Sequence, residues 1–303
     1  MRKNIWRIKR KVRSFYDHFS LIPFGSSVNT RFIILTSPRS GSNLLSNHLR
    51  IHKNIMMHSE IFNLFAISRT ELDSILINPR SYLKDILEKR SPPSINTLGF
   101  KIFYSQANEL QLSPDLNLAL GIPEPGDDWR KKISGVQDYV NQNYDNEKIA
   151  AGFRDVWTLL EEDTSIKVIH LIRENKLKQF LSLYRASVTD VWKSYDKKTL
   201  KDTPVSLQYE DCLNFFKKYT SWEHEFDELF YKHDKISITY EEFVKNKIPV
   251  LKKVQNFLNV PLREDLSTGL VKQRGGSLSE TIFNYRELKS NFKNSEWEHF
   301  FED

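Results

Sequence analysis

A strand, a tight polar turn and a helix follow one another between residues 31 and 49, in the sequence RFIILTSPRSGSNLLSNHL. The continuous apolar run at 32–35 is typical of a parallel strand covered on both faces. Leucines then recur at helical spacing, so the turn at 36–43 precedes a helix N-terminus. Unpaired backbone N–H groups and the positive end of the helix dipole attract anions there. This turn, the anion loop, predicts a phosphate or sulfate site.

Each residue type in the anion loop suits an anion. Gly41 lets the backbone approach a ligand closely, Arg39 supplies a fixed charge, and serine and asparagine side chains add donors. An ordinary strand-to-helix connection with Ser and Asn as caps explains the same residues. A Walker A loop is excluded, because it requires GxxxxGK[ST] and the anion loop has no such lysine.

The octapeptide PRSGSNLL resembles the 5′-phosphosulfate loop of sulfotransferases that use 3′-phosphoadenosine-5′-phosphosulfate (PAPS), in the PRSGST form of bacterial carbohydrate and glycolipid sulfotransferases. The resemblance covers roughly residues 31 to 301. It implies an α/β fold like that of P-loop NTPases, with three layers and a central parallel sheet flanked by helices. It also implies cofactor-binding roles for Ser37, Pro38, Arg39, Ser40, Gly41, Ser42, Asn43 and Leu44.

Three later segments resemble the remaining cofactor-binding parts of that family. The strand and helix of IKVIHLIRENKLKQFLSLYRA, at 166–186, would bind the 3′-phosphate through Arg173 and Ser182, although a plain surface charge also explains Arg173. The segment KISITYEEFV resembles one whose tyrosine lies near adenine, which makes Tyr240 a candidate. The basic, glycine-bearing segment LVKQRGGS resembles the one that closes the cofactor site; its candidates are Lys272, Gln273, Arg274 and Gly275.

Catalytic candidates follow two further predicted strands. The apolar piece 55–57 precedes His58 and Glu60, and ligands bind at the carboxyl ends of parallel strands. The family carries a carboxylate at this place, so Glu60 is the expected base and His58 the reserve base; Glu60 as the start of the next helix is the alternative. Lys101 lies within the predicted strand 97–104. It either faces the transferred group, as in similar GFK strands of the family, or lies at a sheet edge.

The positive charge of the chain belongs to its N-terminus. Residues 1–30 hold seven of the 45 Lys and Arg and one of the 39 Asp and Glu, which accounts for the whole excess of +6. Nucleic-acid binding by the main body therefore loses its electrostatic support. Apolar residues recur every three or four positions up to Phe19, which predicts a basic amphipathic helix. Such a helix suits a membrane surface, a partner subunit or its own domain, and oligomerisation stays open.

The remaining pattern predicts one sulfotransferase domain at 31–303 after the N-terminal extension at 1–30. Helices are expected at 70–90, 133–144, 204–231 and 248–258, a loop or lid at 112–130, and a lead into another strand at 148–154. Cys212, the one cysteine, is expected to be buried in the helix at 204–231. No apolar run approaches the ~18 residues of a membrane span. The single cysteine allows no intramolecular disulfide and the sequence has no Asn-x-Ser/Thr sequon, and both absences favour a reducing cytoplasm.

The expected reaction is transfer of a sulfuryl group from PAPS to a hydroxyl or, less often, an amine, with release of 3′-phosphoadenosine-5′-phosphate (PAP). Glu60 would take the acceptor's proton, and Arg39, with Lys101, would stabilise the leaving group. No metal is predicted. A nucleotide-dependent kinase or other phosphoryl transferase, and a non-catalytic nucleotide- or membrane-binding protein, stay as alternatives. The acceptor, whether small molecule, sugar or glycolipid, cannot be identified from the sequence.

Overall fold

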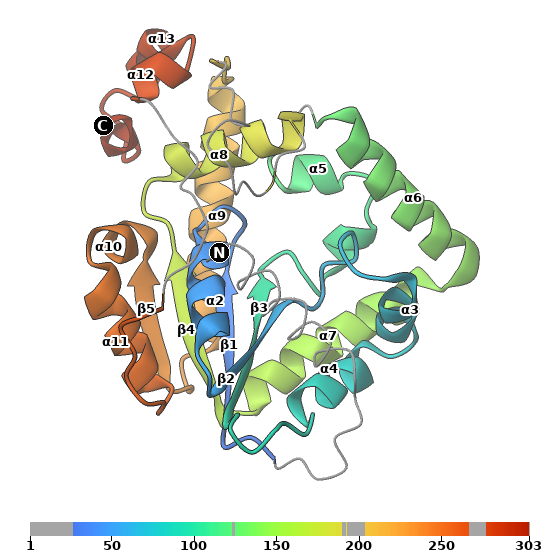
Figure 1. Cartoon of the computed structure of the whole chain (residues 1–303). Helices are drawn as coiled ribbons and strands as arrows, with labels where there is room; N and C mark the ends of the chain where they lie inside the picture. Colours follow the sequence, from blue (N-terminus) through green and yellow to red (C-terminus); the bar gives the residue numbers. More distant parts are fainter. Residues whose placement is uncertain (1–26, 123–124, 190–191, 193–203, 267–276, 303) are drawn as a thin grey trace, which may run out of the picture.

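Five parallel strands form one sheet in the computed structural model, which describes residues 27–122, 125–189, 192, 204–266 and 277–302 (Figure 1). The order across the sheet is β2-β3-β1-β4-β5. The strands are β1 (Thr30–Thr36), β2 (Ile55–Glu60), β3 (Thr97–Phe103), β4 (Ile166–Ile172) and β5 (Lys235–Thr239). The strands β1 to β4 lie where the sequence predicts strands, and the α/β fold with a central parallel sheet is confirmed.

Helices cover both faces of this sheet, because successive side chains of β1 point to opposite sides. Phe32 and Ile34 pack with α2, α10 and α11, whereas Ile33 and Leu35 pack with α3, α4, α7 and the end of α9. A further apolar cluster joins α8 and α9 to the C-terminal helices beyond the sheet (Figure 1). The helices are α2 (Ser42–Ile51), α3 (Arg69–Ile77), α4 (Pro79–Leu87), η1 (Glu109–Leu112), α5 (Leu116–Ala119), α6 (Asp127–Asn143), α7 (Asn146–Glu162), α8 (Lys176–Thr189), α9 (Tyr209–Leu229), α10 (Tyr240–Lys245), α11 (Lys247–Phe257), α12 (Leu278–Thr281), α13 (Tyr285–Asn291) and η3 (Glu298–Phe301).

The strand register brings the ends of three strands to one place. Thr36, the last residue of β1, pairs with Phe103 of β3 on one side and with Leu171 of β4 on the other. The chain leaves β1 for β2 on one side and later crosses to β4 on the other, and ligands bind at such a switch point. The anion loop therefore starts in the middle of the sheet, between the ends of β3 and β4.

The structure corrects one expected element. Residues 148–154 do not lead into a strand; they belong to α7, which Asp145 caps by accepting from two backbone N–H groups. Ile149, Phe153, Val156 and Leu160 are buried on one side of α7, at helical rather than alternating spacing.

Other expected elements are refined. The stretch 70–90 forms two helices, because Asn78 caps α4 and Pro79 begins it. The stretch 112–130 contains η1, α5 and the start of α6 between irregular residues. Cys212 is buried, as predicted. Within the described residues, none of the helices combines the length and the apolar character that crossing a bilayer requires.

Candidate active site

Hydrogen bonds within the anion loop and to β4 fix its conformation. The Thr36 hydroxyl donates to the Leu171 carbonyl at 2.5 Å and lies 2.6 Å from the Ser40 hydroxyl. Arg39 and Gly41 both take left-handed backbone conformations, with φ of 64° and 86°. Gly41 is the N-cap of α2, where no side chain caps the helix and no acidic residue occupies the first turn. The amide end of α2 thus stays suited to an anion.

Gln179 of α8 is hydrogen-bonded to the same loop. Its Nε2 donates to Ser37 Oγ and to the Pro38 carbonyl, both at 2.8 Å. Ser37, Ser40 and Ser42 are buried, and Leu44 packs at the edge of the apolar cluster beneath α2. The loop and α8 therefore form one connected unit.

Two arginines and a tyrosine gather on the β4 side of the loop. Arg39 Nε donates to Ser182 Oγ at 2.9 Å and its Nη1 to the Trp192 carbonyl at 2.8 Å. Arg173 Nη1 donates to the Arg39 carbonyl at 3.0 Å, and its guanidinium lies 4.8 Å from the Tyr240 ring centre. The structure thus brings together Arg39, Arg173, Ser182 and Tyr240, which the sequence places on three separate segments.

The electrostatics of this group favour an incoming anion. Burial and then the neighbouring Arg173 lower the pKa of the Arg39 guanidinium to about 10, and burial also lowers the pKa of Arg173. The Nε of Arg173 is buried and has no hydrogen-bond partner among the described residues. An anion bound here would raise the pKa values of both arginines again, because its charge is opposite to theirs. It would also offer the Nε of Arg173 an acceptor.

A second polar group lies on the β3 side of the loop. Lys101 Nζ lies 2.7 Å from Glu60 Oε1 and donates to Asn43 Oδ1 at 2.8 Å. The pairing of β2 with β3 shifts register after Met57, which brings Glu60 opposite Lys101. β3 is an interior strand and Lys101 is only 1% exposed, so the alternative of an edge lysine is wrong. The Glu60 side chain is 13% exposed, which leaves its carboxylate within reach of a ligand.

Two amide side chains complete this group. Asn63 Nδ2 and Gln106 Nε2 donate to Glu60 Oε2 at 2.6 and 3.3 Å. Sequence reasoning missed both, and it quoted Gln179 within a motif without giving it a role. Asn63 and Gln106 follow the ends of β2 and β3 by three residues, but nothing in their spacing shows that two different turns meet at one carboxylate.

Among the described residues, no hydrogen bond or ion pair joins His58 to this group. It falls in the irregular part of β2, its Nε2 is buried without a hydrogen-bond partner among the described residues, and no described contact joins it to Lys101. Burial, and then Lys89 and Arg50, lower the pKa of His58 to about 4. Its role as reserve base stays a prediction.

The C-terminal basic segment, with its candidates Lys272, Gln273, Arg274 and Gly275, lies outside the described residues, as does the predicted N-terminal helix. The residues that lead to the basic segment are fixed to the end of α2 and to the turn after it: His48 Nδ1 lies 2.6 Å from the Leu266 carbonyl, and His52 Nε2 lies 2.8 Å from that of Pro261.

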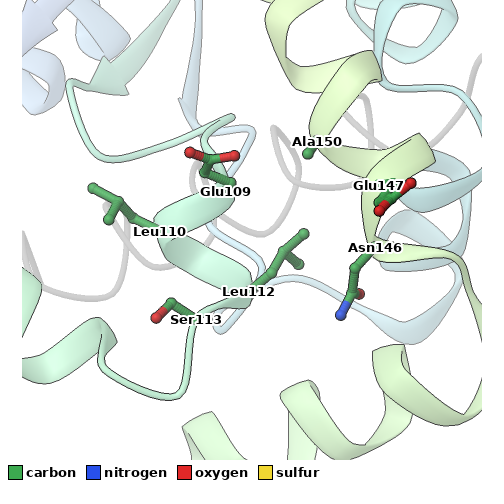
Figure 2. Close-up of a pocket in the computed structure, with 7 residues that line it drawn as sticks. All are labelled: Glu109, Leu110, Leu112, Ser113, Asn146, Glu147 and Ala150. Carbon is green, nitrogen blue, oxygen red and sulfur yellow. The ribbon is translucent and has the colours of Figure 1, made fainter.

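A surface pocket of about 450 Å³ lies between η1 and the start of α7 (Figure 2). It is lined by Glu109, Leu110, Leu112, Ser113, Asn146, Glu147 and Ala150. None of the predicted site residues lines it, so the candidate site rests on the two polar groups beside the anion loop.

The comparison with known families decides the class of protein. A family model described as the sulfotransferase domain matches residues 29–298. The chain belongs to the sulfotransferase family. Nodulation protein H of Rhizobium meliloti (strain 1021) is 22% identical over 273 residues, which cover 89% of this chain and 94% of that protein. Nodulation protein H of Rhizobium tropici is 24% identical over 272 residues, with 89% and 92% covered.

Solved structures of sulfotransferases also match, with low overall scores. A sulfotransferase from Alicyclobacillus acidocaldarius gives a TM-score of 0.41 at 12% identity, covering 88% of this chain and 92% of that one. The sulfotransferase domain of the Synechococcus PCC 7002 olefin synthase gives 0.38 at 15% identity, covering 86% and 84%. The parallel sheet and the family match therefore carry the assignment of this sulfotransferase.

Proposed function

We propose that this sulfotransferase uses PAPS as its donor and transfers the sulfuryl group to an acceptor hydroxyl or, less often, an amine, with release of PAP. One observation carries the proposal: the anion loop, which includes the half-buried Arg39, lies between the half-buried Arg173 on one side and the Lys101–Glu60 pair on the other. The first group suits a phosphorylated nucleotide, and the second suits proton and charge transfer at the reacting atoms.

The nucleotide half consists of the anion loop, Arg173, Ser182 and Tyr240. The buried, unpartnered Nε of Arg173 fits a phosphate, because it offers a charge-assisted donor that the described residues do not use. The ring of Tyr240 lies against Gly41 and beside Arg173, where it would flank a purine or a phosphate. Bound PAPS supplies an activated sulfuryl group attached to a phosphate leaving group.

The transfer half consists of Glu60, Lys101 and Asn43. Glu60 accepts the proton of the acceptor hydroxyl as the hydroxyl oxygen attacks the sulfur of the sulfuryl group. Lys101 lies between Glu60 and Asn43 of the first turn of α2, so its ammonium can offset negative charge at both the base and the loop. Arg39 and His58 stay candidates for the leaving-group cation and the reserve base.

The acceptor is proposed as a small molecule, sugar or glycolipid. Placement in the cytoplasm and oligomerisation stay predictions. Membrane contact through the N-terminal extension at 1–30 also stays a prediction, and residues 1–26 of it lie outside the described part of the chain.

Titration calorimetry with PAP and with Mg-ATP tests the donor. PAP is expected to bind at one site without magnesium, and Mg-ATP is expected to bind weakly or not at all. Tight binding of Mg-ATP and none of PAP would favour a phosphoryl transferase instead. If the protein binds PAP but does not consume PAPS with any of the acceptors tested, a non-catalytic nucleotide-binding protein is favoured.

A further inference from the structure

Two short turns meet at the Glu60 carboxylate. One turn follows β2, where the Asn63 N–H donates to the Glu60 carbonyl at 3.3 Å; the other follows β3, where the Gln106 N–H donates to the Phe103 carbonyl at 2.9 Å. Each turn sends an amide NH2 group to Glu60 Oε2, while Lys101 lies at Oε1. The carboxylate is therefore held at both oxygens by three side chains from two strand ends.

The orientation of both amides is fixed by the backbone. Asn63 Oδ1 accepts from the Phe65 N–H at 3.3 Å, and Gln106 Oε1 accepts from the Phe103 N–H at 3.1 Å. Since an amide oxygen must face each of these N–H groups, the NH2 group of each side chain must face Glu60. Gln106 is also only 4% exposed, and its backbone carbonyl accepts a hydrogen bond from Trp157 Nε1 at 3.2 Å. The turn that carries Gln106 therefore has little conformational freedom.

We propose that Asn63 and Gln106 are positioning residues that fix the Glu60 carboxylate, in its ionised form, toward the reacting atoms. The inference rests on the proposed role of Glu60 as the base. Hydrogen bonds donated to a carboxylate stabilise its charged form, and two donors on one oxygen prevent rotation of the group. Lys101 of β3 is the charged group in described contact with Glu60; Asn63 and Gln106, on the two packed turns, are neutral, and His58 lies on β2 itself.

Isosteric variants separate this role from a merely structural one. Asn63→Asp and Gln106→Glu keep the oxygens that accept from Phe65 and Phe103, but replace the donors that face Glu60 by a second oxygen. Gln106→Met removes the donor without adding a charge. Asn108→Asp is the matched control: Asn108 Oδ1 accepts from the Leu110 N–H at 2.9 Å in the same segment, and no described contact joins its side chain to Glu60.

The direct measurement is the titration of Glu60 by NMR in the ligand-free full chain labelled with ¹³Cδ-glutamate, with the Glu60 signal assigned by its loss in Glu60→Gln. The Glu60 midpoint is expected to rise by about one pH unit or more in Asn63→Asp and Gln106→Glu, and by roughly half a unit in Gln106→Met. Asn108→Asp is expected to leave it unchanged. Equal midpoints in wild type and all four variants would overturn the inference.

Kinetics distinguish this inference from the proposed function. With labelled PAPS, Asn63→Asp and Gln106→Glu are expected to lower kcat roughly tenfold and leave the KM for PAPS unchanged, as loss of positioning in the transition state requires. If the Glu60 midpoint shifts in the variants but the wild-type chain never consumes PAPS, the proposed function is contradicted and the positioning is not. Normal kcat in both variants of an active enzyme would contradict the positioning alone.

Discussion

Gly41→Ala is the substitution for which the structure gives the clearest magnitude. A Cβ built on Gly41 would lie 2.3 Å from Cδ2 and 2.8 Å from Cε2 of Tyr240, at a backbone φ of +86°. The left-handed backbone alone costs a non-glycine residue ~1–2 kcal/mol. Displacing the tyrosine ring from a packed position adds ~1–3 kcal/mol. The variant is therefore expected to lose about 2–5 kcal/mol of unfolding free energy, a fall in Tm of roughly 3–8 °C for a chain of this size.

Gly135→Ala is the control for this change. Gly135 lies in α6, and a Cβ there would meet nothing within 4 Å. Because alanine favours a helix over glycine, this variant is expected to gain ~0.5–1 kcal/mol. Thermal unfolding of both variants, with PAP titration of each, gives the comparison. PAP affinity should fall at least tenfold in Gly41→Ala, about 1.4 kcal/mol, and stay unchanged in Gly135→Ala.

A double variant divides the cost into its two parts. In a Tyr240→Ala background the ring is absent, so Gly41→Ala should cost only the backbone share of ~1–2 kcal/mol. The reasoning is refuted if Gly41→Ala behaves like Gly135→Ala in both Tm and PAP affinity. It is also refuted if removal of the Tyr240 ring leaves the cost of Gly41→Ala unchanged.

Two further predictions concern the arginine group and His58. Arg173→Ala should lower PAP affinity tenfold or more, because a charge-assisted bond is lost, while affinity for adenosine 5′-phosphosulfate stays unchanged; equal losses in calorimetry would sink the 3′-phosphate assignment. Burial lowers the pKa of His58 to about 4, whereas the unfolded chain binds a proton at His58 with a pKa of ~6.5. The contribution of neutral His58 to folding stability is therefore fully present above pH ~6.5 and is lost as the pH falls toward 4. Urea unfolding should show a stability loss between pH 7 and pH 5 that is about 2 kcal/mol smaller in His58→Leu than in wild type, and equal losses would contradict the burial of neutral His58.

The sequence predicted the sheet because the apolar run at 32–35 and the segment at 168–172, which is apolar except for His170, are typical of buried parallel strands. It misassigned 148–154, since Ile149 and Phe153 read equally as the approach to a strand or as one side of a helix until Asp145 is recognised as a cap. Short apolar stretches carry too little periodicity to decide this.

The sequence indicated candidate residues most directly where a motif occupies one strand-to-helix connection. The anion loop and Arg173 are of that kind, and each appears where its strand ends. The contacts of Lys101 with Asn43 and Glu60 depend on the order of β2, β3 and β1, and on a register shift that no local pattern encodes. Asn63 and Gln106 were missed for the same reason, because their meeting is a property of two turns and not of either one.

The charge of Glu60 is the feature on which the proposed chemistry depends most. Glu60→Gln keeps the shape of the side chain but cannot accept a proton, and it leaves Lys101 without its carboxylate partner. Unchanged PAP affinity is therefore the test that the variant is folded. Glu109→Gln is the matched control, because Glu109 is an exposed carboxylate in the segment after β3 (Figure 2).

The measurement that tests the account most directly is transfer of ³⁵S from labelled PAPS to a panel of hydroxylated and amine acceptors, with sulfate release to water measured in the same tubes. The wild-type chain and Glu109→Gln are expected to transfer label, and Glu60→Gln to lose roughly 10²–10⁴ in kcat with PAP affinity close to wild type. Wild-type turnover in Glu60→Gln, together with its loss in His58→Ala, would assign the base to His58. No consumption of PAPS by the wild-type chain with any acceptor would contradict the central claim.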